Sequence, residues 1–359
     1  MAHTVFITGA AGYVGGMLVE QFSARPDVVR IIGLDKESMP EDLCGNEKLI
    51  YLEYNTADEG WEEIVQKYQP DIVIHTAWQI RELYGDRERE WKWNVDGSDR
   101  VFDFAFEQPS VKRLIYFSTV SSYGAFSSNT TDHFFTENEP FRKTDYLYAE
   151  EKRAAEEHLE ERYKKARGTG SVPRVFILRP AAITGPRGRF ARIRFGLQSA
   201  LSGSLKGRGS TLYNFVSLLV SWVPVTPSWL RQYVHEDDVS DIVALLSFGD
   251  VKGDYEAFNL APPGRAVFGA DMARAVGKRT LPTPPWVVRF AFFVMWNMTR
   301  GRIPTGRGSW KGYSYPIAVD GSKLSREYGY HYRSQSFDAF YATNGRYESV
   351  VPEELRRRA

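Results

Sequence analysis

The sequence predicts an α/β fold in which a doubly wound parallel sheet is joined to a smaller, irregular C-terminal region. Three observations predict this fold. An apolar run at residues 5–7 leads into a glycine-rich turn and then into a helical pattern. Strand-like and helix-like segments then alternate through the first 180 residues, as βαβ units do. After Pro180 the alternation stops, and arginine, glycine and tryptophan become frequent.

The N-terminal turn has the features of a site that holds a pyrophosphate. Its glycines are spaced Gly-x-x-Gly-x-x-Gly between a buried strand and an apolar helix. Glycines let the backbone turn tightly and approach a ligand, and a helix N-terminus presents unpaired N–H groups with partial positive charge. The alternative is a plain strand-to-helix turn. The residues expected to hold a cofactor here are Gly9, Gly12, Tyr13, Val14 and Gly15.

The other elements of the sheet follow from apolar runs and from helical spacing. Strands are predicted at residues 28–34, 49–53, 72–75, 113–118 and 174–178. Helices are predicted at residues 61–68, 93–106 and 148–165. The strand at 72–75 is apolar on both faces, which is typical of a central parallel strand. Right-handed crossovers would bring the C-terminal ends of these strands to one ligand crevice.

The change of pattern divides the chain into two regions. We expect a Rossmann domain at residues 1–180, with late sheet elements at about 234–261. Residues 181–233 and 262–350 are expected to form the substrate-binding region.

Composition excludes several classes of protein. The chain has 359 residues, of which 43% are hydrophobic and 25% charged, as in an ordinary globular protein. A net charge of +1 gives no global field for nucleic acid or an anionic membrane. The single cysteine, Cys44, excludes an intrachain disulfide. The first residues do not read as a signal peptide, and no stretch is long enough to span a bilayer, so we expect a cytoplasmic protein. His75 has no Cys or His companion at metal spacing, so no metal site is predicted.

Asp35 indicates which dinucleotide would bind. It lies 20 residues after Gly15, at the end of the second predicted strand. A carboxylate there accepts hydrogen bonds from a ribose diol and repels a 2′-phosphate, which favours NAD over NADP. The alternative is a helix cap or turn aspartate, and the adjacent Lys36 would soften the discrimination. Asn55 follows the third strand and could reach the adenine edge, although asparagine is also a common turn residue.

A candidate catalytic pair opens the long helix at 148–165. The i to i+4 spacing places Tyr148 and Lys152 on one helix face. A phenol with a pKa near 10 is a poor base at pH 7, and a neighbouring ammonium would lower that pKa. The pair could then move a proton at a carbinol oxygen while a nicotinamide moves the hydride. Thr119, at the end of the fifth strand, could bond the same substrate oxygen.

Further motifs accompany the glycine turn and the Tyr148-x-x-x-Lys152 pair. They are Ile74-His75-Thr76-Ala77, Asn94-Val95-x-Gly97, Ser118-Thr119, Thr136-Glu137-x-x-Pro140, Leu178-Arg179-Pro180 with Gly185-Pro186, Val234-His235-x-x-Asp238-Val239 and Phe258-Asn259. With these motifs the chain resembles the extended short-chain dehydrogenase/reductases, in the NAD-dependent epimerase/dehydratase branch, over nearly its whole length. The motifs are highly specific for the superfamily and say little about the substrate.

The resemblance implies roles for particular residues. It implies Thr119, Tyr148 and Lys152 as the catalytic triad, and Thr119 is chosen over nearby serines by its distance before Tyr123-Gly124. It also implies a homodimer through two long helices, one of which begins at Tyr148. The cofactor-binding residues that it adds to the glycine turn, Asp35 and Asn55 are Thr76, Ala77, Asn94, Tyr148 and Lys152.

Two departures from the family pattern bear on the substrate. Family 4,6-dehydratases carry an Asp-Glu pair after the catalytic hydroxyl residue, where this chain has Val120-Ser121, so a dehydratase is not expected. Members that bind nucleotide-sugars usually have an Asn where this chain has Ala182. Against that loss, Arg231 has the spacing of a family arginine that contacts the substrate diphosphate. The candidates for a second such arginine are Arg300, Arg302 and Arg307.

Several other features allow two interpretations. Arg187 is a candidate substrate contact within a basic cluster that could equally be a solvated face. The apolar segments 212–225 and 286–296 are expected to pack in the core or a lid, or else to form an apolar substrate pocket or a surface that touches lipid. His75 and His235 are expected to be structural. The basic cluster that contains Arg187 consists of Arg187, Arg189, Arg192 and Arg194.

Three functions follow from these residues. The preferred function is a nucleotide-sugar epimerase, in which NAD is regenerated in each cycle. The alternative is an NAD-dependent dehydrogenase or reductase of a hydrophobic secondary alcohol or ketone, similar to the hydroxysteroid dehydrogenases, favoured by Ala182 and the late aromatic segments. A non-catalytic protein on the same fold is a third possibility, and the complete set of Thr119, Tyr148 and Lys152 speaks against it.

Overall fold

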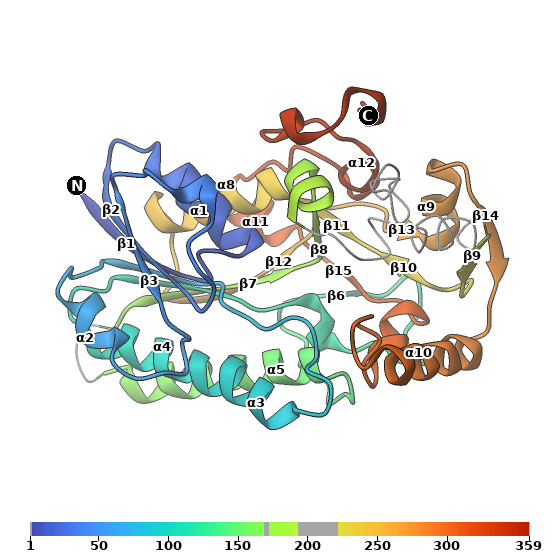
Figure 1. Cartoon of the computed structure of the whole chain (residues 1–359), viewed down its shortest axis with the longest axis horizontal. Coiled ribbons are helices and arrows are strands. Elements are labelled where there is room, and N and C mark those ends of the chain that lie inside the picture. The colour runs from blue at the N-terminus through green and yellow to red at the C-terminus, as the bar shows by residue number, and fades with distance from the viewer. Residues whose placement is uncertain (1, 169–171, 193–221, 359) are drawn as a thin grey trace. The chain divides into compact units, whose positions relative to one another are not determined.

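The chain separates into two compact units, each with its own hydrophobic core (Figure 1). The computed structural model describes residues 2–168, 172–192 and 222–358. Unit 1 comprises Met1–Ser122, Leu147–Arg179 and Ser240–Phe258. Unit 2 comprises Tyr123–Tyr146, Pro180–Val239 and Asn259–Ala359.

Unit 1 is built on a seven-stranded sheet with the order β12-β7-β5-β4-β1-β2-β3. Its first strands, β1 to β5, pair in parallel, as do β5 and β7. This confirms the predicted doubly wound parallel sheet. The strands are β1 (His3–Thr8), β2 (Val28–Asp35), β3 (Leu49–Glu53), β4 (Ile72–His75), β5 (Arg113–Phe117), β7 (Arg174–Pro180) and β12 (Tyr255–Leu260).

The strand order reverses beside β1, which fixes the place of a ligand crevice. Val5 of β1 pairs with Ile31 of β2 on one side and with Ile72 of β4 on the other. Successive strands after β1 therefore go first to one edge of the sheet and then to the other. In open α/β sheets, ligands bind outside the C-terminal ends of the strands at such a switch point.

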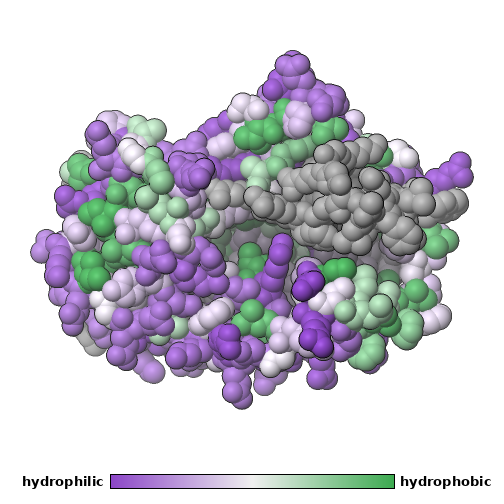
Figure 2. Space-filling model, viewed as in Figure 1, coloured by the Kyte–Doolittle hydropathy of each residue, from purple (hydrophilic) through white to green (hydrophobic). Residues whose placement is uncertain are grey.

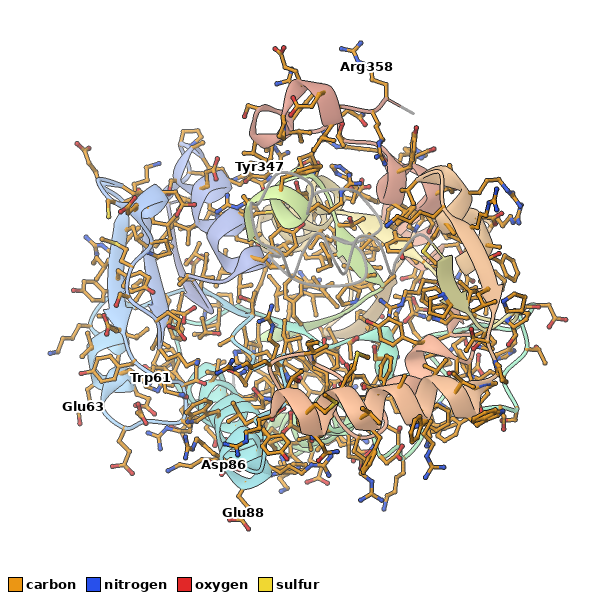
Figure 3. All side chains as sticks on the ribbon, turned by 45° about the vertical axis from the view of Figure 1, so that its right-hand side comes forward. Trp61, Glu63, Asp86, Glu88, Tyr347 and Arg358 are labelled. Carbon is orange, nitrogen blue, oxygen red and sulfur yellow. The ribbon has the colours of Figure 1, made fainter. Side chains whose placement is uncertain are left out.

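Helices cover both faces of the sheet in unit 1. Figure 1 shows α1 on one face and α4 and α5 on the other. Phe6 of β1 lies against the rings of Trp61 and Phe104 at 5.5 and 5.7 Å, in the core beneath α2 and α4, and Trp61 is labelled in Figure 3. The helices are α1 (Tyr13–Ser23), α2 (Trp61–Gln66), α3 (Arg87–Trp91), α4 (Gly97–Glu107), α5 (Leu147–Ala166) and α8 (Glu236–Phe248).

One helical segment begins earlier than its apolar spacing predicts. The helix expected from Trp93 starts instead at Arg87, as α3, and passes through a π-helical turn at Lys92–Asp96 into α4. The Asp86 side chain caps the start by accepting a hydrogen bond from the Arg89 N–H at 3.2 Å. The segment 87–91 is polar, so periodicity could not show it, whereas the capping aspartate could.

Unit 2 is irregular, as the sequence suggests. Its short paired strands are β8 (Ala182–Thr184) with β11 (Tyr233–His235), β10 (Leu230–Arg231) with β13 (Val267–Phe268), β9 (Trp222–Val225) with β14 (Arg279–Pro282), and β6 (Phe134–Phe135) with β15 (Ala318–Val319). Its helices are α9 (Gly269–Ala275), α10 (Pro285–Thr299), α11 (Lys323–Tyr328) and α12 (Ser336–Tyr341). A core around Trp229, Tyr233, Met272 and Phe340 holds these pieces together.

None of the described helices is long and apolar enough to cross a bilayer. Within the described residues, no group of three or more His, Cys, Asp or Glu side chains could hold a metal ion.

Candidate active site

The glycine turn after β1 is packed too closely for any side chain. Gly9 has a φ of +76°, and a Cβ there would lie 2.6 Å from Thr76 Oγ1 and 2.7 Å from the Ala77 nitrogen. A Cβ on Gly15 would lie 2.0 Å from the Gly9 carbonyl oxygen. The turn therefore needs its glycines in order to fold against the segment that follows β4.

The helix that leaves this turn offers donors to an anion. Gly12 is the N-cap of α1 and has no side chain to satisfy the first N–H groups, and the first turn, from Tyr13, contains no acidic residue. Val14 continues that turn, and both residues are partly exposed. The four N–H groups of a helix start need partners. A bare glycine cradle beneath a helix start fits the pyrophosphate of NAD.

Asp35 lies directly against the glycine turn. Its Oδ2 accepts a hydrogen bond from the Ala11 N–H at 3.0 Å, and its Oδ1 accepts one from the Glu37 N–H at 3.0 Å. Burial raises the pKa of the Asp35 carboxyl, against the lowering effect of these two bonds. The carboxylate is thus placed where a ribose diol beside the turn would meet it. Asn55 accepts the Ala57 N–H at 3.0 Å within its own turn.

A buried chain of hydrogen bonds fixes the segment after β4. His75 Nδ1 lies 2.7 Å from Thr8 Oγ1 and His75 Nε2 lies 2.8 Å from Ser98 Oγ. Ser98 donates to the Asn94 carbonyl at 2.5 Å, so the His75 ring must donate to Ser98 and accept from Thr8. Burial lowers the pKa of His75 well below its usual range. The ring is a neutral connector, in agreement with the structural role expected for it.

Thr76 and Ala77 are held to the end of β1. Thr76 Oγ1 donates to the Thr8 carbonyl at 2.7 Å, and the Ala77 N–H donates to Thr8 Oγ1 at 3.3 Å. Both residues therefore border the glycine turn at the switch point of the sheet. Their expected role at the cofactor remains a proposal.

Asn94 is buried in the π-helical turn and uses its amide inside the protein. Its Oδ1 accepts the Gln79 N–H at 2.7 Å, and its Nδ2 donates to the Gln79 carbonyl at 3.1 Å and to Glu151 Oε2 at 2.7 Å. The π-helical turn projects the side chain inward. In this structure Asn94 positions the backbone around Gln79 and the helix α5.

The three candidate catalytic residues come together in unit 1. Tyr148, in the first turn of α5, is hydrogen-bonded to the Thr119 side chain. Thr119 is buried at the end of β5, where its Oγ1 also accepts the Ser121 N–H at 3.2 Å. Burial raises the pKa of Tyr148, and the bond to Thr119 opposes that rise. The hydroxyl pair that the sequence predicts is present.

The surroundings of Lys152 bear on the electrostatic role expected of it. Its ammonium is buried, donates to the Phe117 carbonyl and lies 3.5 Å from the centre of the Trp78 ring. Burial lowers the pKa of Lys152 well below its usual range. The net pKa of Tyr148 is raised, because desolvation of the phenol dominates, and the lowering effect expected of Lys152 stays a prediction.

The sequence did not indicate that two glutamates, Glu90 and Glu151, are buried. Burial raises the pKa of Glu151 to about 8 and that of Glu90 to about 7. The charge of Glu90 adds to the rise at Glu151. Glu151 lies three residues after Tyr148, so the two residues are neighbours on the surface of α5. This spacing from Tyr148 could have indicated that Glu151 lies close to the candidate catalytic residues.

Arg231, the arginine that the sequence predicts as a substrate contact, lies in unit 2. Arg231, in β10, places its guanidinium 4.7 Å from the centre of the Tyr313 ring and 5.7 Å from that of Trp229. Within the part of the chain that the structure describes, no carboxylate forms an ion pair with it. The guanidinium is also hydrogen-bonded to the Tyr313 side chain. It keeps its charge, and its remaining N–H donors can serve another acceptor.

The basic cluster is only partly within the described residues. The Arg187 side chain is buried and lies 5.0 Å from the centre of the Tyr347 ring, which Figure 3 labels. Arg189 is also buried and donates to the carbonyls of Phe340, at 2.6 Å, and Ala342. These two side chains are interior, so they do not form a solvated face. The Arg192 side chain and Arg194 lie outside the described residues, and the role expected of Arg187 remains a proposal.

The His235-x-x-Asp238 motif holds the C-terminal segment of unit 2. His235 lies 3.2 Å from the Asn344 carbonyl through Nε2 and accepts the Asp237 N–H through Nδ1 at 3.1 Å. Asp238 Oδ1 accepts from the Tyr330 hydroxyl at 2.8 Å and from the Arg333 N–H at 2.9 Å. These contacts give the motif a structural role.

Comparison with known proteins places the geometry in a family. The model of the family described as "NAD dependent epimerase/dehydratase family" matches residues 5–261, which is more than two-thirds of the chain. The sterol-4-alpha-carboxylate 3-dehydrogenase (decarboxylating) of Schizosaccharomyces pombe is 24% identical over 298 residues, covering 80% of this chain and 78% of the relative.

Two solved structures share the fold. The enzyme WbmG of Bordetella bronchiseptica, in complex with NAD and UDP, is similar with a TM-score of 0.69 and 20% identity, over 95% of this chain and 92% of that chain. UDP-glucose 4-epimerase of Thermotoga maritima, with UDP-glucose, gives a TM-score of 0.66 and 18% identity, over 94% of this chain and 96% of that chain.

Proposed function

The chain belongs to the NAD-dependent epimerase/dehydratase family and uses NAD, and from this premise we propose that it is a nucleotide-sugar epimerase. Its substrate would be a sugar joined to a nucleoside diphosphate. The reaction would invert one carbinol carbon without net oxidation. The likeness to structures that contain UDP or UDP-glucose supports this choice.

The observation that carries the proposal is the environment of Arg231. Its guanidinium is half-buried between the rings of Tyr313 and Trp229. A diphosphate is a strong anion that an arginine can bind with two parallel hydrogen bonds. A neutral, hydrophobic alcohol would leave this cation without an anionic partner, at a cost in binding. Arg231 therefore favours a nucleotide-sugar over an apolar substrate.

The hydroxyl pair of unit 1 supplies the proton transfer. Bound NAD would supply the acceptor and donor of the hydride that leaves the sugar carbon and returns to it. Tyr148 would remove the proton from the sugar hydroxyl and later give it back, and Thr119 would hold the same oxygen. Because burial raises the pKa of Tyr148 in this structure, the phenol is well suited to donate its proton in the returning step.

A dehydratase needs a further acid and base that this chain does not place beside Thr119. The two residues that follow it, Val120 and Ser121, lie in a 3-10 turn, and neither is a carboxylic acid. Elimination of water therefore has no obvious base here. An epimerase needs only the hydroxyl pair and room for the keto-sugar to turn.

The proposal is tested with a panel of UDP- and dTDP-sugars, followed by proton NMR. We expect one pair of epimers to interconvert without accumulation of NADH. Arg231→Gln should raise KM by about 10- to 100-fold and leave NAD affinity unchanged. Arg265→Gln is the matched control, since Arg265 is exposed and paired with Asp271 at 3.0 Å. No epimer with any sugar of the panel would overturn the proposal.

A second function is favoured by two observations. The sterol dehydrogenase of Schizosaccharomyces pombe aligns with 80% of this chain, and Ala182 stands where sugar-binding members usually have Asn. An NAD-dependent dehydrogenase of a hydrophobic secondary alcohol would form NADH in proportion to the alcohol. Stoichiometric NADH with a sterol-like alcohol, and none with sugars, would establish that function instead.

A further inference from the structure

Helix α10 exposes large apolar side chains to solvent. Trp286 is 70% exposed, Phe290 65%, Phe293 65% and Met298 81%, and no residue of the helix is buried. This excludes the core packing expected for residues 286–296. Figure 2 shows hydrophobic side chains gathered over α10 at the lower right of the view, and Figure 3 shows the helix in the foreground. Exposed apolar patches of this kind usually mark an interaction site.

Three of these exposed residues form one stripe along the helix. Trp286, Phe290 and Phe293 are spaced i, i+4 and i+7, so they share a face. The helix is fixed from another side, where the Phe292 ring lies 5.3 Å from that of Tyr313. Because this contact fixes the orientation of α10, the three side chains of the stripe are directed to solvent by a packed helix. We call Trp286, Phe290 and Phe293 the apolar stripe of α10.

The charged residues of the segment that contains α10 are all basic, and two of them, Arg274 and Lys311, pair with aspartates outside it. From Met272 to Val319 the sequence contains eight Lys and Arg residues and no Asp or Glu. Arg289 lies within the helix, and Arg300 and Arg302 follow it directly, all three exposed. The net charge of the whole chain is only +1, so positive charge is concentrated here. An apolar face bordered by cations is complementary to a surface that has an apolar interior and anionic groups at its boundary with water.

We propose that α10 binds the surface of an anionic lipid bilayer. The helix would lie parallel to the surface, with the apolar stripe in the boundary between headgroups and acyl chains and the arginines among lipid phosphates. Trp286 at the start and Trp296 near the end suit this boundary, where tryptophan is enriched. With 15 residues, α10 is shorter than the roughly 20 that a spanning helix needs.

The charge also argues against a second copy of the chain as the occupant. A twofold contact would bring the same patch of each subunit together. Arg289, Arg300 and Arg302 of both copies would then meet with no acidic residue between Met272 and Val319 to balance them. An anionic bilayer neutralises the same charges.

Vesicle flotation tests the proposal on the whole protein. The protein should float with vesicles of phosphatidylcholine that contain about 30% phosphatidylglycerol. Its binding should weaken in high salt and on vesicles of pure phosphatidylcholine. The double variant F290E/F293E should bind at least about tenfold more weakly. F337E is the matched control, because Phe337 is an exposed phenylalanine on α12 and is 40% exposed. Circular dichroism and NAD binding should be unchanged in both variants.

The other outcomes overturn the proposal. They are an absence of binding to anionic vesicles, equal binding by F290E/F293E and the wild type, and binding that ignores lipid charge. Light scattering adds a further test. A dimer that dissociates in F290E/F293E, without vesicle binding by the wild type, would make the apolar stripe a contact between copies. These readouts do not depend on the substrate, so they stand apart from the proposed epimerase activity.

Discussion

Asn94 donates a hydrogen bond from Nδ2 to Glu151 Oε2 over 2.7 Å, and this bond joins the π-helical turn Lys92–Asp96 to α5. The same amide binds the backbone of Gln79 through both its oxygen and its nitrogen. One side chain thus fixes the segment after β4 and the helix that carries Tyr148. Asn94 is a positioning residue, and Glu151 is the acceptor that anchors it to α5.

The buried Glu151 carboxyl should make stability depend on pH. Burial raises its pKa from 4.5 in the unfolded chain to about 8, so the folded state holds an extra proton between these values. Stability should therefore fall as pH rises through this window, by an amount on the order of 1–3 kcal/mol. Glu151→Gln keeps an acceptor for Asn94 and should remove this part of the loss. Urea unfolding at several pH values measures it.

Glu157→Gln is the control for this effect. Glu157 lies on the same helix, is exposed and pairs with Arg153 at 2.5 Å. Its replacement should change stability by less than about 1 kcal/mol at any pH. If the pH profile of Glu151→Gln matches that of the wild type, Glu151 is not the titrating group.

Tyr148→Phe should lower turnover by about 10²- to 10⁴-fold, because it removes the proton donor and acceptor. NAD binding should persist, since the glycine turn and Asp35 are untouched. Tyr116→Phe is the matched control. The Tyr116 hydroxyl is buried and has no hydrogen-bond partner among the described residues, so its removal should leave turnover intact. Product formation by NMR and NAD titration by calorimetry measure the two effects. Substantial turnover by Tyr148→Phe would show that another residue transfers the proton.

The fold could be predicted from the sequence because the patterns that indicate its strands and its glycine turn are local. The strand at 72–75 and its neighbours appear as short apolar runs, and the glycine turn stands between a buried strand and an apolar helix. The pairing of Thr119 with Tyr148 follows from the same order of strands and helices, since both lie at the end of the sheet where the strand C-termini meet.

The features that the sequence did not reveal are those that depend on how deeply each side chain is buried. Whether Lys152 lowers the pKa of Tyr148 depends on how much solvent each group loses, which spacing does not report. The interior position of Arg187 follows from contacts with Tyr347, 160 residues later in the chain. The outward stripe of α10 has the composition of a core helix, and only its packing partners distinguish the two.

Gly15→Ala should destabilise the protein by about 2 kcal/mol or more and abolish NAD binding. Its Cβ would lie 2.0 Å from the Gly9 oxygen and 2.6 Å from the Gly9 carbonyl carbon, and backbone atoms in a tight turn cannot move aside. Gly312→Ala is the control, because a Cβ there meets nothing within 4 Å. Thermal unfolding with and without NAD measures both effects. Normal stabilisation of Gly15→Ala by NAD would contradict the placement of the cofactor at this turn.

Asp35→Ser should shift the cofactor preference from NAD toward NADP. Asp35 faces the turn and bonds the Ala11 N–H at 3.0 Å, so its charge would repel a 2′-phosphate there. Removing that charge should weaken NAD binding by about tenfold and strengthen NADP binding by a similar factor. Glu37→Gln removes an equal charge two residues away, where Glu37 pairs with Lys36 at 3.0 Å. Calorimetry with both dinucleotides measures the ratio. An equal change in both variants would mean that net charge near the turn, rather than the position of the Asp35 carboxylate, sets the preference.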